Sequence, residues 1–227
     1  LSLALRINAP PDPPPNNLTN AHKAGRPFRV AGTAVNALSV PTTNYVGAPS
    51  AALSSCVGTP ACLALGTDCA CTPGTGTLSL SGNAVAGMYV TTTATYDNTG
   101  AFSAQLQDTT FSNVDVADTP ADCAGRYICS ASINVGRFVP DHFTLTSGAI
   151  TAACTSGPTP FTYMNQGFPT FTANIEARAY LTETVTSNHH SPDFGLTQLA
   201  AVDWQAENAD NGLSLAARLS VPQPPVI

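Results

Sequence analysis

The sequence predicts an all-β protein with two Ig-like antiparallel β-sandwich domains in tandem, the second of which need not be complete. Three observations predict this class: apolar and polar residues alternate along several segments, Pro and Gly separate these segments, and Thr occurs 29 times. Alternation indicates half-buried strands, because successive side chains of a strand point to opposite faces. The β-branched side chain of Thr favours strand over helix, and short strands between turn residues are typical of a sandwich.

Individual strands follow from the same pattern. Met88–Gln107 is expected to be a β-hairpin, because Asp97–Gly100 supplies turn residues between a Thr-rich segment and an alternating one. Phe171–Leu181 and Leu213–Leu219 also alternate, so each is expected to be a strand with one apolar and one polar face.

Loop-like composition divides the chain. Residues 1–19 are expected to form a strand and a stiff Pro-rich linker, because Pro fixes φ and cannot donate to a sheet. Residues 20–146 are expected to form the first sandwich, with a Cys-rich insertion at about residues 48–77. Residues 147–227 are expected to form the second, and Ser147–Pro160 is expected to separate the two.

Charged residues are scarce: 8 Lys and Arg and 14 Asp and Glu make 10% of the chain, with a net charge of −6. Nucleic-acid binding needs clustered cations, so a chain whose only lysine is Lys23 is not expected to bind nucleic acid. No segment approaches the roughly 18 apolar residues of a membrane helix, so no membrane span is expected here. The chain has neither an initiator Met nor a signal peptide, and is expected to be an internal or mature segment.

The cysteines predict an exported protein held by disulfides, because they lie in Gly-, Pro- and Thr-rich loops of a chain that is short of Lys and Glu. A zinc site built from the first four is the alternative, but their spacing does not match paired Cys-x2-Cys knuckles. Cys123 and Cys129 are expected to bond, because Gly125 permits a tight reversal and closure removes about 2–3 kcal/mol of chain entropy from the unfolded state. The other cysteines are expected to form two bridges in one of three connectivities, with Cys154 as the odd thiol: Cys56, Cys62, Cys69 and Cys71.

Asp141 and His142 invite a catalytic interpretation in which the carboxylate orients the imidazole as a base. Adjacent strand residues face opposite ways, however, so these two side chains are not expected to converge. We expect Arg137 to pair with Asp141 at a corner. Four apolar neighbours are expected in the core: Phe138, Val139, Phe143 and Leu145.

Motifs of catalytic sites are missing from the sequence, including the nucleophile elbow, the zinc-protease helix, the phosphate loop and the dinucleotide fingerprint. The chain is therefore not expected to be an enzyme, and no catalytic residue, cofactor or metal is expected. Tyr163, Tyr180 and Trp204 could stack on sugar rings. The alternative function is therefore that of a carbohydrate-binding module of a larger secreted protein, with a glycan as partner.

The two ends of the chain resemble each other, because Leu1–Pro10 and Leu213–Pro222 share six of ten positions. If each is the last strand of a sandwich, the N-terminal copy would complete another domain. A strand removed from its own sheet leaves an open edge that pairs readily with a neighbour. Head-to-tail chaining of copies would follow, with four residues expected to lie between subunits: Leu1, Leu3, Leu5 and Ile7.

Gly136–Phe143, with the sequence Gly-Arg-Phe-Val-Pro-Asp-His-Phe, resembles the signature of the MSHA-type pilus biogenesis protein Q family, in its large C-terminal domain of unknown function. A stretch from Ala24 to Gly47 and Phe161–Met164 after Cys154 are similar to the same family. The resemblance implies a secreted cell-surface protein, structural or adhesive, associated with a pilus or extracellular fibre. Its implied partners are other surface or pilus proteins, and it supplies no catalytic residues.

Overall fold

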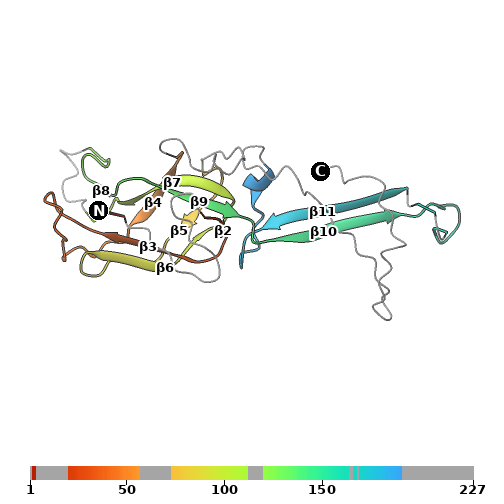
Figure 1. Cartoon of the computed structure of the whole chain (residues 1–227), viewed down its shortest axis with the longest axis horizontal. Coiled ribbons are helices and arrows are strands. Elements are labelled where there is room, and N and C mark those ends of the chain that lie inside the picture. Colours follow the sequence, from red (N-terminus) through yellow and green to blue (C-terminus); the bar gives the residue numbers. More distant parts are fainter. Residues whose placement is uncertain are drawn as a thin grey trace.

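The computed structural model describes residues 2–3, 20–56, 73–111, 120–163, 166–167 and 169–190, which are all-β as predicted (Figure 1). One 3₁₀ helix follows the last strand, and among the described residues no helix has the length and apolar character needed to cross a membrane. The elements are β1 (Ser2–Leu3), β2 (His22–Lys23), β3 (Phe28–Thr33), β4 (Ser50–Ser54), β5 (Leu78–Ser79), β6 (Met88–Tyr96), β7 (Gly100–Asp108), β8 (Ile128–Cys129), β9 (Ile133–Val139), β10 (His142–Thr151), β11 (Thr170–Arg178) and η2 (Ser187–His190).

The strands before residue 140 form two sheets. The first has the order β1-β3-β6-β5, and all its pairs are antiparallel. The second has the order β2-β9-β7-β4 with β8 also on β7, and is antiparallel except for the short β2–β9 pair. Apolar side chains of both sheets form one cluster between them, so the two sheets make a β-sandwich.

Aromatic rings fill the centre of this core. Phe102 of β7 and Phe138 of β9 stack with centroids 5.8 Å apart, and Tyr96 of β6 packs against both at 4.5 and 4.8 Å. On β3, buried Phe28 and Val30 alternate with half-buried residues, as period two predicts. Phe138 is therefore a core residue, which confirms that part of the prediction.

The predicted hairpin at Met88–Gln107 is wrong, although both of its strands exist. β6 lies in the first sheet and β7 in the second, so the connection between them crosses the sandwich. Asn98 and Thr99 in this connection are buried at 4% and 3% exposure. A hairpin and a sheet-to-sheet connection need the same turn residues, so the local sequence does not distinguish them.

The N-terminal strand corrects the hypothesis of strand exchange between copies. Leu3 pairs with Gly32, so β1 adds to the edge of the first sheet of its own chain. Ser2 and Leu3 are thus paired with the Gly32–Thr33 end of β3 in their own chain and not with a neighbouring copy. Leu1, Leu5 and Ile7, also expected between subunits, lie outside the described residues.

The Cys-rich insertion is narrower than the predicted range 48–77. Ser50–Ser54 forms β4, which pairs with β7 along its whole length. These residues therefore belong to the second sheet of the sandwich. Residues 57–72 lie outside the described residues.

β10 and β11 form a two-stranded ribbon that projects from one end of the sandwich (Figure 1). Its register runs from His142–Arg178 at the base to Thr151–Thr170 at the tip, with an irregularity in β10 after Leu145. We call this unit the ribbon.

The prediction that Phe143 and Leu145 lie in the core is wrong, because on the ribbon they are 47% and 65% exposed. β10 has already left the sandwich here, and among the described residues no second sheet covers it. Residues 147–151, expected in a linker, continue β10 instead, so the boundary expected after residue 146 falls inside a strand. A second sandwich beyond the ribbon stays a prediction, since residues 191–227 lie outside the described residues.

Candidate functional site

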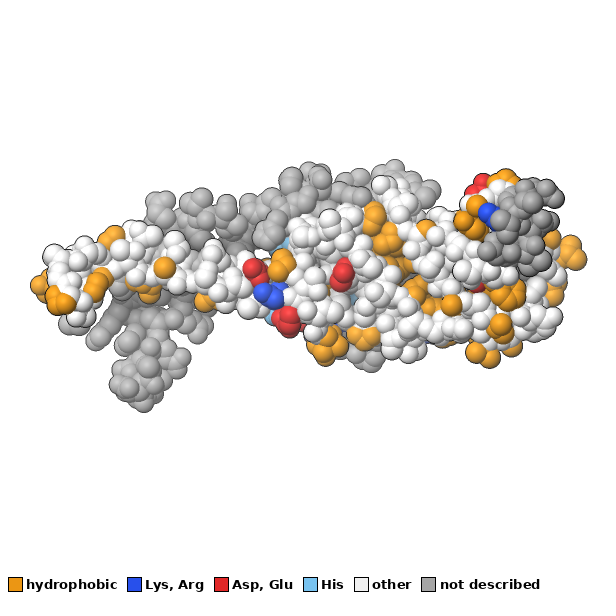
Figure 2. Space-filling view, turned by 180° about the vertical axis from the view of Figure 1, so that it is seen from behind, with side chains coloured by type: hydrophobic (Ala, Val, Ile, Leu, Met, Phe, Trp, Pro, Cys, Tyr) orange, Lys and Arg blue, Asp and Glu red, His pale blue; other side chains and the backbone are white. Residues whose placement is uncertain are grey.

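Charged side chains gather at the base of the ribbon, where it leaves the sandwich (Figure 2). The group includes the only lysine of the sequence and two of its three glutamates. Charges are rare in this chain, so their concentration marks the junction as the candidate site. We call the group the junction cluster, and its members are Lys23, Arg26, Asp141, His142, Glu176, Arg178 and Glu183.

The turn between β2 and β3 lies directly against the end of the ribbon. Tyr180 donates a backbone hydrogen bond to the carbonyl of Ala24 at 2.9 Å. Gly25 has a φ of 78°, and a Cβ there would lie 2.5 Å from the carbonyl oxygen of Tyr180. Only glycine meets both conditions without strain, so Gly25 permits the contact that places Arg26 at the junction.

Asp141, between β9 and β10, accepts the main interaction of the cluster. Nε of Arg26 donates to Oδ1 of Asp141 at 2.6 Å, and Nζ of Lys23 lies 3.9 Å from the same oxygen. Burial raises the pKa of Asp141, but hydrogen bonds from Arg26 and His142 and the charges of Arg26 and Lys23 lower it by more, so the pKa lies below its ordinary value. The ionised carboxylate therefore binds the β2–β3 turn to the start of the ribbon.

His142 lies beside Asp141, against the expectation that their side chains diverge. Its Nδ1 is 3.1 Å from Oδ2 of Asp141 and its Nε2 is 3.2 Å from Oε2 of Glu183. Asp141 lies in a bend before β10, so strand alternation does not separate the two residues. In a catalytic triad one ring nitrogen faces the nucleophile, whereas both nitrogens of His142 face carboxylates. The ring of His142 therefore contacts two segments, the bend before β10 through Asp141 and the turn after β11 through Glu183.

Arg178, the last residue of β11, makes contacts at the base of the ribbon with both its side chain and its backbone. Its guanidinium pairs with Glu176 and donates to the backbone carbonyl of Glu183. Its own carbonyl accepts a hydrogen bond from the backbone N–H of Asp141 at 2.9 Å. Arg178 thus ties the turn after β11 to the strand, which places Glu183 opposite His142.

A second set of contacts, which we call the asparagine lock, joins η2 to the sandwich. The backbone N–H of Asn188 donates to Oδ1 of Asn98 at 3.1 Å, and its side-chain amide donates to the carbonyl of Thr99 at 3.1 Å. Nδ2 of Asn98 donates to the hydroxyls of Thr75 and Ser187, both at 3.1 Å. Both asparagines are buried, and loss of one would leave buried polar groups unpaired.

Together the two sets attach the base of the ribbon and the η2 segment that follows it to the sandwich at two separate places. The junction cluster attaches the start of β10 and the end of β11 to the β2–β3 turn, and the asparagine lock attaches η2 to the β6–β7 connection. Two attachments at separate places oppose rotation about either one. The chemistry of the site is therefore that of a fastening between two β-structures.

The sequence did not reveal Arg26 or Glu183 as site residues. It paired Asp141 with Arg137, but Arg137 lies on β9 and its backbone N–H donates to Asn20 at 3.0 Å. No motif or spacing points to the observed partners. The signal that the sequence does offer is composition. Charged residues are scarce in this chain, so each one is a candidate for a specific pairing.

The structure separates the aromatic residues that were expected to contact a ligand. The guanidinium of Arg26 lies over the Tyr180 ring at 4.8 Å, a cation–π contact at the base of the ribbon. Tyr163 belongs to the connection at the opposite end, with its ring 5.0 Å from that of Phe161. Trp204 lies outside the described residues. Tyr163 and Tyr180 do not form one sugar-binding platform.

The predicted bond between Cys123 and Cys129 is confirmed, with Cα atoms 5.6 Å apart. Gly125 is needed there because a Cβ would lie 2.3 Å from the carbonyl oxygen of Pro120. Cys154 is a free cysteine, as expected. Cys56 is disulfide-bonded, and the remaining cysteines of its group lie outside the described residues: Cys62, Cys69 and Cys71.

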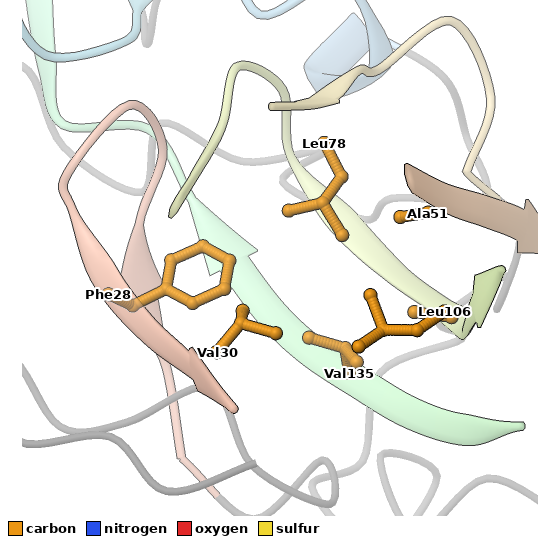
Figure 3. Close-up of a pocket in the computed structure, with 7 residues that line it drawn as sticks. Phe28, Val30, Ala51, Leu78, Leu106 and Val135 are labelled. Atoms are coloured by element: carbon orange, nitrogen blue, oxygen red, sulfur yellow. The ribbon is translucent and has the colours of Figure 1, made fainter. Parts of the chain in front are cut away.

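A small apolar space lies between the two sheets (Figure 3), with room for about one water molecule. Its lining carries no polar side chain, so it is a packing gap of the core. Among the described residues, no group of three or more His, Cys, Asp or Glu side chains is placed to hold a metal ion. The space is lined by Phe28, Val30, Ala51, Leu78, Ala104, Leu106 and Val135.

The family model described as DUF6701, third domain, matches residues 100–225. No curated protein and no solved structure matches the chain. The matched range begins at β7 and includes the ribbon, Asp141, Arg178 and Asn188, whereas Arg26 and Asn98 precede it. Both fastenings therefore join the matched range to the part of the chain before it.

Proposed function

The chain belongs to the DUF6701 family, matched through its third domain, and on that premise we propose that it is a structural module of a secreted cell-surface protein associated with a pilus or another extracellular fibre. The observation that carries the proposal is the fastened junction between Arg26 and Asp141. A module in which two β-structures keep a fixed direction can space and orient the domains on either side of it. Its partners would be other surface or pilus proteins.

Two further observations support this role. The Cys123–Cys129 bond suits an oxidising compartment, where disulfides form and persist. The pilus association is supported by the resemblance of Gly136–Phe143 to the MSHA-type pilus biogenesis protein Q family. In the structure this segment contains Phe138 of the core and Asp141 and His142 of the junction cluster, so its residues serve the fastening.

Immunogold electron microscopy of intact cells that express the parent protein tests the role. An antibody raised against this chain should label the outer surface and its fibres, and cells that lack the gene should show no label. Labelling confined to the cell interior would contradict the proposal. Cells that carry Arg26→Ala together with Asn188→Ala should keep the surface label but show altered fibres, because the module would be exported without its fixed direction.

A further inference from the structure

The ribbon has one apolar and one polar face. Paired residues of antiparallel strands share a face, and Leu145 and Ile150 pair with positions 175 and 171 of β11, which lie an even number of residues apart. Residues five positions apart in a regular strand lie on opposite faces, but the irregularity after Leu145 brings Ile150 to the same face as Leu145. The opposite face is formed by polar pairs, such as Thr151 with Thr170.

Only the base of the apolar face is covered by described residues, where Ala177 is buried and the ring of Phe143 lies 5.7 Å from the ring of His189. Leu145 and Ile150 are 65% and 58% exposed, and residues 143–175 contain no Asp, Glu, Lys or Arg. Exposed sheet edges are usually protected by charges. A two-stranded ribbon is also marginally stable in water without a third strand or a packed face.

β11 offers the regular edge for a third strand. Its residues Thr170–Glu176 pair only with β10 among the described residues, and without an irregularity in β11 itself. At the base, the turn after the ribbon already occupies this edge, since the N–H of Thr186 donates to the carbonyl of Ala177 at 2.9 Å. The open part of the edge therefore runs from Thr170 to Glu176.

The family match takes in both the ribbon and Leu213–Val221, so one domain of the family contains the open edge and this segment. Residues 191–227 lie outside the described residues, and only their sequence bears on them here. Leu213, Leu215 and Leu219 fall at alternate positions, as in a strand with one apolar face. The connection 191–212 begins at the base and is long enough, because an extended chain covers about 3.3 Å per residue and the ribbon is about 30 Å long.

We propose that Leu213–Val221 is the third strand of this sheet, paired with the outer edge of β11 along Thr170–Glu176. Its leucines extend the apolar face that Leu145 and Ile150 begin. The ribbon is then part of a larger sheet completed by its own chain, independently of the function proposed above.

Hydrogen–deuterium exchange on the full chain tests this pairing. The outward amides of Thr170–Glu176 should be protected, and Leu215→Asp should lower their protection about tenfold or more. Ser214→Asp, which adds the same charge to the opposite face, should leave it within about twofold. Amides of β7 report whether the sandwich stays folded in both variants.

Three results would overturn the proposal. The outward amides of β11 could exchange as freely as in an unfolded chain. The two variants could have equal effects while β7 stays protected. Protection could rise with protein concentration, which would assign the edge to a second copy.

Discussion

Nε of Arg26 donates a hydrogen bond to Oδ1 of Asp141 at 2.6 Å, and this contact joins residues 115 positions apart in the chain. The same guanidinium lies over the ring of Tyr180 at 4.8 Å. One side chain of the sandwich therefore contacts the segment that leads into β10 and the segment that follows β11. Arg26, which belongs to neither strand of the ribbon, therefore contacts the chain both before β10 and after β11.

Replacement of Arg26 should destabilise the protein. Arg26→Ala removes a charge-assisted hydrogen bond and leaves a largely buried carboxylate, so we expect the free energy of unfolding to fall by about 2 kcal/mol in a urea titration. Arg29→Ala is the matched control, because Arg29 is a half-buried arginine of β3 outside the junction cluster. It should cost less than about 0.5 kcal/mol. Equal losses of unfolding free energy in the two variants would contradict the assignment of this stabilisation to the contact between Arg26 and Asp141.

Asp141 should make the stability depend on acid pH. Burial raises its pKa, but the hydrogen bonds from Arg26 and His142 and the charges of Arg26 and Lys23 together lower it by more, so the folded pKa lies below the unfolded one. Such a group stabilises the fold above the unfolded pKa of about 3.9 and loses this contribution as the pH falls through the folded pKa. The free energy of unfolding should therefore fall less steeply below about pH 5 in Asp141→Asn than in the unaltered chain.

The control for this pH series is Asp122→Asn, which replaces an exposed aspartate outside the junction cluster. Oδ1 of Asp122 accepts hydrogen bonds from the backbone N–H groups of Ala124 and Gly125, and the amide oxygen of asparagine can accept both. This variant should therefore stay closer to the curve of the unaltered chain than Asp141→Asn does. Burial raises the pKa of Asp108, but the backbone N–H groups of Phe111 and Thr110 and the hydroxyls of Tyr45 and Thr110 donate hydrogen bonds to its carboxylate and lower the pKa by more. Some acid dependence should therefore persist in Asp141→Asn. A curve for Asp141→Asn as steep as that of the unaltered chain would refute the linkage.

Removal of the Cys123–Cys129 bond should cost about 2 kcal/mol, the entropy of a short loop in the unfolded chain. Thermal unfolding of the Cys123→Ser, Cys129→Ser double variant measures the loss. Cys154→Ser is the control, because Cys154 is a free cysteine, and should leave the melting temperature nearly unchanged. If Cys154→Ser lowered the melting temperature more than the double variant does, the Cys123–Cys129 bond would not be the stabilising element.

Residues 100–225 alone should not fold into the observed structure. The matched range supplies Phe102 and Phe138, whereas their ring partners Tyr96 and Phe28 precede it. The isolated range would expose one face of the second sheet. Its near-ultraviolet circular dichroism should lack the aromatic signal of the full chain, and a native-like signal would show that the sandwich is not the folding unit.

The sequence predicts the strands of the sandwich well, because alternation and turn residues are local signals. Phe138, expected in the core, is buried, whereas Val139 beside it is only half-buried. The assignment of β6 and β7 to different sheets was missed, because it depends on contacts far apart in the chain. The exposure of Leu145 was missed for a related reason: alternation shows that a strand has an apolar face, but not what covers that face.

The junction cluster was the least predictable part. Asp141 and His142 stood out as a pair, but strand alternation suggested that they diverge, and only the bend before β10 brings them together. Arg26 and Glu183 are distant in sequence and belong to no motif. The position of Arg26 follows from the close approach of Gly25 to Tyr180, and that of Glu183 from the hydrogen bond between Arg178 and its carbonyl.

Pulsed electron paramagnetic resonance tests whether the ribbon keeps one direction relative to the sandwich. One spin label goes on the free thiol of Cys154, beyond the tip of β10, and the other on Thr92→Cys, at an exposed position of β6. The fastened junction predicts one narrow distance distribution, which should broaden when Arg26→Ala and Asn188→Ala are combined. A broad distribution in the otherwise unaltered chain would show that the ribbon moves freely and that the junction does not hold it.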